Sequence, residues 1–261
     1  MTLKHGHTTF VHIFNGEFNP LIIQMKYYII TGTSSGLGEA LAEEAILQNY
    51  KVFCISRRLN SRLKQLGADK RSGLWYFEHD LTRISEIQPL MKEIFSFIDE
   101  QSAIEINLIN NAGVVQPVGP LGKLNAEDIL GHININLTAP VTLINEFIRE
   151  TERFKCRKNI VNLTTGAASH PYFGWSLYCS SKAGVDMLTR VGGLEQSSSE
   201  FPVRIMAIAP GVVDTPMQQQ IREVDPGDFP MKPKFDKLHK EGKLVPPSEA
   251  ARSIIKMIDS D

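Results

Sequence analysis

Six short apolar runs, each followed by a longer stretch with helical periodicity, constrain the fold of this chain more than any other feature. The runs are Tyr27–Thr31, Val52–Ser56, Trp75–His79, Ile106–Asn110, Ile160–Thr164 and Arg204–Ala209. Apolar runs that alternate with helical segments are typical of βαβ units, in which right-handed crossovers cover both faces of a parallel sheet with helices. The sequence therefore predicts an α/β fold with a doubly wound parallel sheet.

The length of 261 residues suits one domain of this class. Residues 1–24 show neither strand alternation nor a helical stripe, so we expect them to be a disordered or non-native extension before a single domain at 25–261. The extension contains His5, His7 and His12 at irregular spacing. Irregular histidines without carboxylates do not predict a metal site.

Charge and cysteine content exclude several classes of function. The 28 Lys+Arg residues balance 29 Asp+Glu residues, which gives a net charge of −1 and no basic patch for a nucleic acid or a polybasic membrane anchor. No apolar stretch reaches the roughly 18 residues of a membrane span. The cysteines Cys54, Cys156 and Cys179 follow no disulfide or zinc spacing. We therefore predict a cytoplasmic protein with a small-molecule partner, no nucleic acid and no membrane.

A glycine motif, Thr31–Gly38, directly follows the first apolar run and leads into a helix predicted over 37–48. One glycine allows the tight turn, a second lets the backbone approach a pyrophosphate, and a third permits close packing of helix and strand. The helix N-terminus adds free N–H groups and a partial positive charge. The alternative is an ordinary strand–helix turn. We predict a dinucleotide site that includes Gly32, Ser34, Ser35, Gly36, Leu37 and Gly38.

The second apolar run ends at Arg57 and Arg58, where an NAD-binding protein would usually place an acidic residue. Guanidinium groups make bidentate bonds to phosphate oxygens. The pair therefore indicates the 2′-phosphate of NADP(H), to which Ser34 or Ser35 could add a hydroxyl. Two solvated surface arginines are the alternative.

Tyr178 and Lys182 are one turn apart at the start of a helix predicted from Ser180 to about Leu194. A free phenol has a pKa of ~10. A neighbouring ammonium, helped by a bound nicotinamide cation, would lower that pKa and let tyrosine exchange a proton with a carbonyl oxygen. Half-buried packing with a solvated tip is the alternative for such a pair.

Together the glycine motif, Asn110–Gly113, Asn136 and the Tyr178/Lys182 pair resemble, in this order, the short-chain dehydrogenase/reductase family. The resemblance runs from Tyr27 to about Ile258 and implies a single-domain Rossmann-type fold. Within the family, residues 171–179 and 182–188 resemble the benzil reductase and sepiapterin reductase branch.

The resemblance implies a role for each catalytic residue. Tyr178 would be the general acid in the reduction direction, Lys182 would tune its pKa and bind the nicotinamide ribose, and Asn136 would hold a proton-relay water. Thr165 stands where the family has a serine. It keeps the hydroxyl and adds a methyl group. Thr164 is the neighbouring alternative, although strand alternation would turn it toward the opposite face.

The resemblance also implies further cofactor contacts at the ends of three strands. The residues would contact the adenine, line the wall beside the adenosine and hold the carboxamide. They are Asp80 and Leu81, then Asn111, Ala112 and Gly113, then Pro210, Gly211, Val213 and Thr215. The alternative for each is a polar strand end that satisfies backbone groups.

Residues 217–245 lie where the family places a substrate lid, and the Pro/Gly-rich part at 225–233 predicts a mobile loop. Met217 and Trp175 are predicted substrate residues, and Tyr172 and Phe173 could also line the pocket, with ordinary packing as the alternative. After a helix predicted over 248–257 the family's seventh strand is missing. We expect an open sheet edge, which points to a truncated record or to lower stability.

The resemblance as a whole implies an NADPH-dependent carbonyl reductase that acts on a ketone or a vicinal dicarbonyl, benzil-like and (S)-benzoin forming. A pterin diketone reductase of the sepiapterin type is one alternative, and a non-catalytic NADP(H)-sensing regulator is another. The family usually pairs through the helices that hold Asn136 and Tyr178, so a homodimer is expected.

Overall fold

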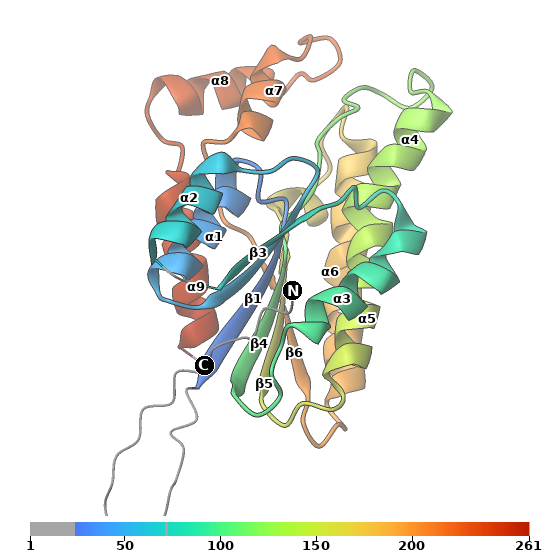
Figure 1. Ribbon diagram of the computed structural model, residues 1–261. Coiled ribbons are helices and arrows are strands. Elements are labelled where there is room, and N and C mark those ends of the chain that lie inside the picture. The colour runs from blue at the N-terminus through green and yellow to red at the C-terminus, as the bar shows by residue number, and fades with distance from the viewer. Residues whose placement is uncertain (1–23, 71–72, 261) are drawn as a thin grey trace, which may run out of the picture.

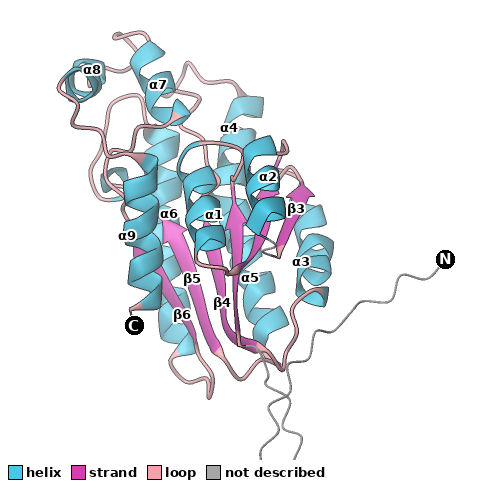
Figure 2. Ribbon diagram, turned by 60° about the vertical axis from the view of Figure 1, so that its left-hand side comes forward, coloured by secondary structure: helices cyan, strands magenta, loops and turns pink. Residues whose placement is uncertain are grey.

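One parallel sheet organises the molecule, whose computed structural model describes residues 24–70 and 73–260. The strands are β1 (Met25–Thr31), β2 (Lys51–Ser56), β3 (Leu74–Glu78), β4 (Ala103–Asn110), β5 (Arg157–Leu163) and β6 (Val203–Ile208). Their order is β3-β2-β1-β4-β5-β6, and all five pairings are parallel (Figure 2). The doubly wound Rossmann-type sheet is therefore confirmed. The predicted extension, with its three histidines, lies outside the described residues except for Gln24.

Helices cover both faces of the sheet (Figure 1). On one face lie α1 (Gly36–Leu47), α2 (Ser61–Lys70) and α9 (Pro247–Asp259); on the other lie α3 (Ile87–Ser96), α4 (Ala126–Ile133), α5 (Ala139–Thr151) and α6 (Ser176–Gln196). The helices α7 (Pro216–Glu223) and α8 (Lys232–Lys240) lie beyond the carboxyl ends of the strands. Single turns at Ile84–Glu86 and Gly166–Ala168 and a π-helical segment at Asn134–Thr138 complete the elements of the described residues.

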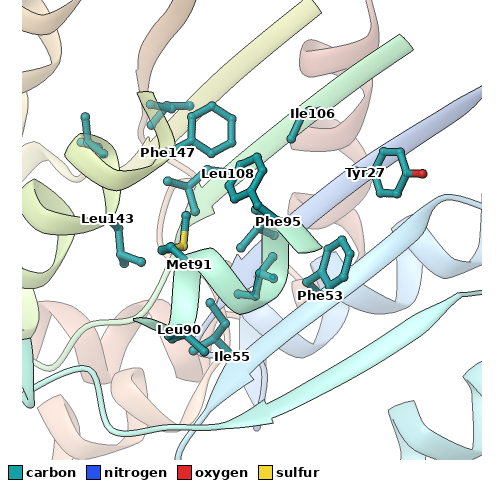
Figure 3. Close-up of a cluster of buried hydrophobic side chains, with 14 of the residues drawn as sticks. Tyr27, Phe53, Ile55, Leu90, Met91, Phe95, Ile106, Leu108, Leu143 and Phe147 are labelled. Atoms are coloured by element: carbon teal, nitrogen blue, oxygen red, sulfur yellow. The ribbon is translucent and has the colours of Figure 1, made fainter. Parts of the chain in front are cut away.

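Two apolar layers fill the space between sheet and helices because alternate strand residues point to opposite faces. Tyr27 and Ile29 belong to the layer under α3 and α5, where Figure 3 shows Phe95 and Phe147. Tyr28 and Ile30 belong to the layer under α1 and α9. Burial on both faces explains why the strands are apolar throughout, and it fixes the carboxyl ends of the central strands along one edge.

Two strands begin three residues earlier than predicted, β4 at Ala103 and β5 at Arg157. Both starts carry polar residues that an apolar run does not include. Glu105 on β4 is 3% exposed at its side chain and accepts a bond of 2.6 Å from Arg157. The ion pair lets charged residues occupy buried strand positions.

The helix α6 begins at Ser176, four residues before the predicted start, so Tyr178 lies inside its first turn. The chain turns into the helix at Gly174, which has φ +81°. A Cβ atom there would lie 2.1 Å from the carbonyl oxygen of Asp228, a contact that only glycine avoids. This close approach joins the start of α6 to the predicted lid.

A charge cluster at the amino ends of the strands, formed by Lys26, Glu105, Arg157 and Asp259, holds the last helix in place. Lys26 pairs with Glu105 at 3.2 Å and also with Asp259, and Arg157 donates to the Ile258 carbonyl oxygen at 3.1 Å. The hydroxyl groups of Tyr28 and Tyr50 donate to Asp259 at 3.3 and 3.0 Å. With six strands in the described residues, β6 forms an edge of the sheet, and α9 is fixed by these bonds and by its packing on α1.

Candidate active site

A cavity of about 760 Å³ opens at the carboxyl ends of the strands. It lies where doubly wound sheets bind ligands, next to the point between β1 and β4 where the strand order reverses. The site residues predicted from the sequence line it, except Asn136, Tyr172 and Phe173. Segments far apart in the sequence therefore meet at one place, as the order of motifs predicted.

The glycine motif forms a close-fitting cradle at the base of the cavity. Gly32 and Gly36 have φ values of +72° and +64°, which favour glycine. A Cβ atom on Gly38 would lie 2.2 Å from the carbonyl oxygen of Gly32. The start of α1 thus packs directly on the turn, and Gly36, Leu37 and Gly38 line the cavity there.

The Asn111 side chain supports this cradle from the next strand. Its Nδ2 donates to the carbonyl oxygens of Thr31 and Gly32 at 2.8 and 3.3 Å. The Thr31 hydroxyl oxygen in turn accepts from the backbone N–H groups of Asn111 and Ala112 at 3.0 and 2.9 Å. Asn111 therefore acts on the turn itself, while Ala112 and Gly113 continue the cavity wall.

The far end of the cavity is positively charged. Arg57 and Arg58 are exposed there, and Ser34 and Ser35 line the same cavity. Burial opposes ionisation of Asp80, but hydrogen bonds from Thr82 and the charges of Arg57 and Arg83 hold the pKa of its carboxyl below the usual range. The Nε2 atom of His79, also at this end, is buried with no partner among the described residues. An anionic, hydrogen-bonding ligand fits this end.

The segment from Pro210 to Thr215 closes the cavity beside β6. A parallel bridge between Val213 and Val245 holds it, with hydrogen bonds of 2.9 Å on either side. The Thr215 hydroxyl caps the N-terminus of α7 by accepting from the N–H of Gln218 at 3.4 Å. Thr215 therefore positions the helix as well as lining the cavity.

Tyr178 and Lys182 lie one helical turn apart on α6, but their electrostatics differ from the prediction. Burial raises the pKa of Tyr178 to about 12, and it lowers the pKa of Lys182 to about 8 against the opposing charge of Asp186. In the protein alone the Tyr178 pKa is thus raised, and the lowering expected from the ammonium together with a bound nicotinamide cation stays a prediction. The reason for the raised pKa is that rings of Trp175 and His132 surround the phenol, while the Lys182 ammonium donates to the Leu163 carbonyl oxygen at 2.7 Å.

The two candidate threonines have different partners. The Thr164 hydroxyl donates to the Asp186 carboxylate at 2.5 Å. The Thr165 hydroxyl oxygen accepts a long bond of 3.4 Å from the N–H of Ala167, which leaves its hydrogen able to donate. Both residues line the cavity. Thr165 is therefore the better candidate to hold a carbonyl oxygen.

Asn136, in the π-helical segment, is 1% exposed and uses its side chain on the protein. Its Oδ1 accepts from the N–H of Val114 at 2.8 Å, and its Nδ2 donates to the carbonyl oxygen of Val114 at 2.7 Å. The second amide hydrogen is directed to Nε2 of His132 at 2.8 Å. Any contact of Asn136 with a relay water would thus come from its main chain.

His132 is a site residue that the sequence analysis missed. It lines the cavity, is 2% exposed, and its Nδ1 lies 2.7 Å from the Gln116 carbonyl oxygen. Burial lowers its pKa, against hydrogen bonds to Gln116 and Leu177. The neutral ring therefore donates from Nδ1 and accepts the Asn136 amide at Nε2. Its position four residues before Asn136, one helical turn away, was the available signal.

The predicted lid contains the helices α7 and α8 and an apolar cluster that faces the cavity. Met217, Ile221 and Phe235 line the cavity, and Phe229 is fully buried, so the segment predicted as a mobile loop carries a core residue. Trp175 stacks on Phe229 with ring centroids 4.5 Å apart and lies 5.3 Å from the Tyr178 ring.

Trp175 and its two aromatic neighbours have different environments. Trp175 lines the cavity and is 5% exposed, whereas Phe173 is 56% exposed and so does not form an enclosed wall. Tyr172 packs against Trp175 at 5.3 Å. The expectation that Phe173 lines the pocket is wrong because the turn at Gly174 separates it from Trp175.

Within residues 24–70 and 73–260, no group of three or more His, Cys, Asp or Glu side chains could hold a metal ion. None of the helices in that part of the chain is long and apolar enough to cross a bilayer.

Comparison with known proteins gives a family match and curated relatives over most of the chain. The family model described as short chain dehydrogenase matches residues 26–226. A benzil reductase ((S)-benzoin forming) of Bacillus cereus is 42% identical over 237 residues, which cover 91% of this chain and 95% of that protein. A sepiapterin reductase of Rattus norvegicus is 33% identical and covers 89% of this chain and 91% of its own.

Solved structures give the same fold. The KRED1-Pglu enzyme is 28% identical and superposes with a TM-score of 0.74, covering 87% of this chain and 92% of its own. A short chain dehydrogenase/reductase from Saccharomyces cerevisiae is 25% identical with a TM-score of 0.76, covering 89% of both chains.

Proposed function

This chain belongs to the short-chain dehydrogenase/reductase family, and on that premise we propose that it is a carbonyl reductase that uses NADPH and Tyr178 as its general acid. The observation that carries the proposal is the meeting of Tyr178, Lys182 and Thr165 in the same cavity as the glycine cradle. A protein that only bound a dinucleotide would not need Tyr178, Lys182 and Thr165 together.

The cavity fits NADPH along its length. The cradle of Gly32, Gly36 and Gly38 would hold the pyrophosphate at the N-terminus of α1, since the turn packs so closely on Asn111, Ala112 and Thr215 that it has no room for Cβ atoms. Arg57 and Arg58 would bind the 2′-phosphate at the positively charged end. When bound, NADPH supplies the hydride and, after oxidation, a positive charge near the phenol.

The residues of the chain divide the remaining work. Thr165 would donate its hydroxyl hydrogen to the substrate carbonyl oxygen, and Tyr178 would transfer its phenolic proton to the same atom. Lys182, one helical turn from Tyr178 and with its pKa lowered to about 8, would be an ammonium at neutral pH and would stabilise the phenolate that forms. The apolar cluster around Trp175 and Phe235 excludes water from the reacting atoms.

We propose a vicinal dicarbonyl of the benzil type as the substrate class. The 42% identity to a benzil reductase supports it, as do the aromatic side chains of Trp175 and Phe235 at the cavity. A pterin diketone is the second candidate, which the 33% identity to a sepiapterin reductase supports.

A homodimer through α5 and α6 completes the proposal. Four large apolar side chains on these helices are exposed by 40 to 74%: Val141, Met187, Val191 and Leu194. Burial in a two-fold interface would remove them from water. Light scattering in solution should then give twice the mass of one chain. The free cysteines Cys54, Cys156 and Cys179 suit a reducing compartment such as the cytoplasm.

The test of the reaction follows the loss of reduced-nicotinamide absorbance with NADPH or NADH against benzil, a simple monoketone and sepiapterin. We expect NADPH-selective reduction of benzil, and we expect Tyr178→Phe to lose about 1,000-fold in kcat, within the usual range for a general acid. Retention of most of the rate by a Tyr178→Phe variant that still binds NADPH would contradict the proposed mechanism. Tight NADPH binding without turnover of any carbonyl would favour a regulator.

A further inference from the structure

Two side chains at the lid end of the cavity bury polar atoms that have no partner among the described residues. Gln218, on α7, is 3% exposed, and both its Nε2 and its Oε1 are unpaired; Trp175 is 5% exposed, and its Nε1 is unpaired. Both residues line the cavity. Since buried polar atoms are nearly always hydrogen-bonded, the two N–H groups, Gln218 Nε2 and Trp175 Nε1, indicate a missing acceptor.

Trp175 lies beside Tyr178, and Gln218 lines the same cavity from α7. The Trp175 ring lies 5.3 Å from the Tyr178 ring, with the two rings nearly perpendicular. Thr215 caps α7 at the N–H of Gln218, and this cap fixes the start of the helix that carries Gln218. Met217 and Ile221, on the same helix, pack in the apolar cluster that contains Trp175.

The enclosure is otherwise apolar. Phe229 and Phe235 lie against Trp175, with ring centroids 4.5 and 5.6 Å away. Such a pocket takes an aromatic group, and its few polar atoms decide the orientation of the ligand. The indole N–H of Trp175 can only donate, so its partner must be an acceptor oxygen or nitrogen.

We propose that Gln218 and Trp175 form a subsite for a second carbonyl, in which the Gln218 amide N–H and the Trp175 indole N–H hold the non-reacting oxygen of a 1,2-dicarbonyl. Tyr178 and Thr165 then hold the reacting oxygen. This inference rests on the proposed reductase function and specifies how the same cavity selects its substrate. A monoketone leaves both donors buried and unpaired, which a site built to pair them discriminates against.

The experiment compares benzil with deoxybenzoin, in which a methylene group replaces one of the two carbonyls. The measured quantity is the ratio of kcat/KM for benzil to kcat/KM for deoxybenzoin. Gln218→Met keeps the length of the side chain and removes both amide atoms. We expect this ratio to fall about tenfold in Gln218→Met, since one substrate hydrogen bond is lost. The intrinsic reactivity of the two ketones cancels when variant and wild-type ratios are compared.

Gln219→Met is the matched control. Gln219 is the next residue on α7, is exposed, and donates to Glu223 at 2.8 Å. We expect the wild-type ratio in this control. Trp175→Phe, which keeps an aromatic ring and removes the indole N–H, should lower the ratio in the same direction as Gln218→Met.

Thermal unfolding of the ligand-free protein separates this subsite from a structural role. Methionine at 218 fills the same volume and removes no protein hydrogen bond, so the midpoint should stay equal or rise. A large fall in the midpoint would show that Gln218 holds α7 together, and would overturn the proposal. An unchanged benzil/deoxybenzoin ratio in a folded Gln218→Met variant would also overturn it, while the reductase function would stand. Failure of the wild type to reduce either ketone would instead overturn both.

Discussion

The polar side chains at the two ends of the sheet differ in whether they are paired with one another. At the amino end, Lys26, Glu105, Arg157 and Asp259 pair with one another, and the bonds join β1, β4 and β5 to α9. At the carboxyl end, Lys182 is held by a main-chain carbonyl, and Gln218 and Trp175 keep buried polar atoms without a described partner.

This difference separates stability from function within one sheet. Paired charges at the amino end satisfy each other, and nothing is left over for a ligand. At the carboxyl end burial disfavours the ionised forms of Tyr178 and Lys182. At neutral pH this costs stability at Lys182, which is charged in the unfolded chain, and not at Tyr178, whose phenol is neutral in both states. Four predictions break or sharpen the contrast.

The largest effect is expected at the amino end, on stability. Glu105→Gln would leave Lys26 and Arg157 without their shared carboxylate. Removing one partner of a buried pair costs about 3 kcal/mol, the low end of the usual range, because both cations keep some contact with solvent. Urea unfolding measures the change, with Glu93→Gln, on an exposed residue of α3, as the control. Equal stability of the Glu105→Gln and Glu93→Gln variants would contradict a stabilising role of the charge cluster.

The second prediction compares how the contributions of Lys182 and Lys26 to the free energy of unfolding change with pH. The Lys182 pKa is lowered from 10.5 to about 8, so the folded state loses its proton before the unfolded state does. The free energy of unfolding should therefore rise by about 3 kcal/mol relative to Lys182→Met between pH 8 and 10.5.

The pKa shift of Lys26 has the opposite sign to that of Lys182. Burial alone would lower its pKa, but bonds to Asp259 and Glu105 raise it above 10.5. Its contribution to stability is therefore present below pH 10.5 and is lost as pH rises through the raised value. Chemical unfolding of wild type, Lys26→Met and Lys182→Met across this window measures both trends, and slopes of the same sign would refute the contrast.

The third prediction concerns the exposed, positively charged part of the carboxyl end. The double variant Arg57→Ala/Arg58→Ala would lose charge-assisted bonds to a 2′-phosphate. The loss should weaken NADPH binding by about 2 kcal/mol, which raises the Kd for NADPH roughly 30-fold. The Kd for NADH should change little, since NADH has no such phosphate. Titration of both nucleotides by fluorescence tests this, and equal weakening for both would place the arginines elsewhere in binding.

The smallest effect is expected at His132. His132→Phe keeps a ring next to Tyr178 but leaves one Asn136 amide hydrogen buried without its acceptor, which costs about 1 kcal/mol. If that cost falls on the transition state, kcat declines about fivefold. His239→Phe, on an exposed residue of α8, is the control. A wild-type kcat in His132→Phe would show that the hydrogen bond from Asn136 to His132 does not contribute to catalysis and that His132 serves only in packing.

The sequence predicted the sheet well because apolar runs and helical periods follow from burial on two faces. It also predicted which motifs meet in the cavity, because parallel strands end along one edge. It missed the starts of β4 and β5, where an ion pair between Glu105 and Arg157 replaces apolar burial. A pairing between distant strands leaves no local pattern.

The electrostatics of the site were harder to predict. The direction of the Tyr178 pKa depends on how deeply rings from α4 and the loop before α6 enclose the phenol. The role of Gln218 depends on which atoms lack partners, and a sequence does not show that. Both quantities arise only from the packing of separate elements.

The contact at Gly174 has a mechanical consequence. The Asp228 carbonyl oxygen lies where a Cβ atom on Gly174 would stand, and the Gly174 carbonyl accepts from the N–H of Gly119 at 2.9 Å. Three loops thus touch one another through bare backbone, four residues before Tyr178. Because position 174 has no side chain that could change its conformation, a displacement of the loop at Asp228 would be transmitted directly to the first turn of α6.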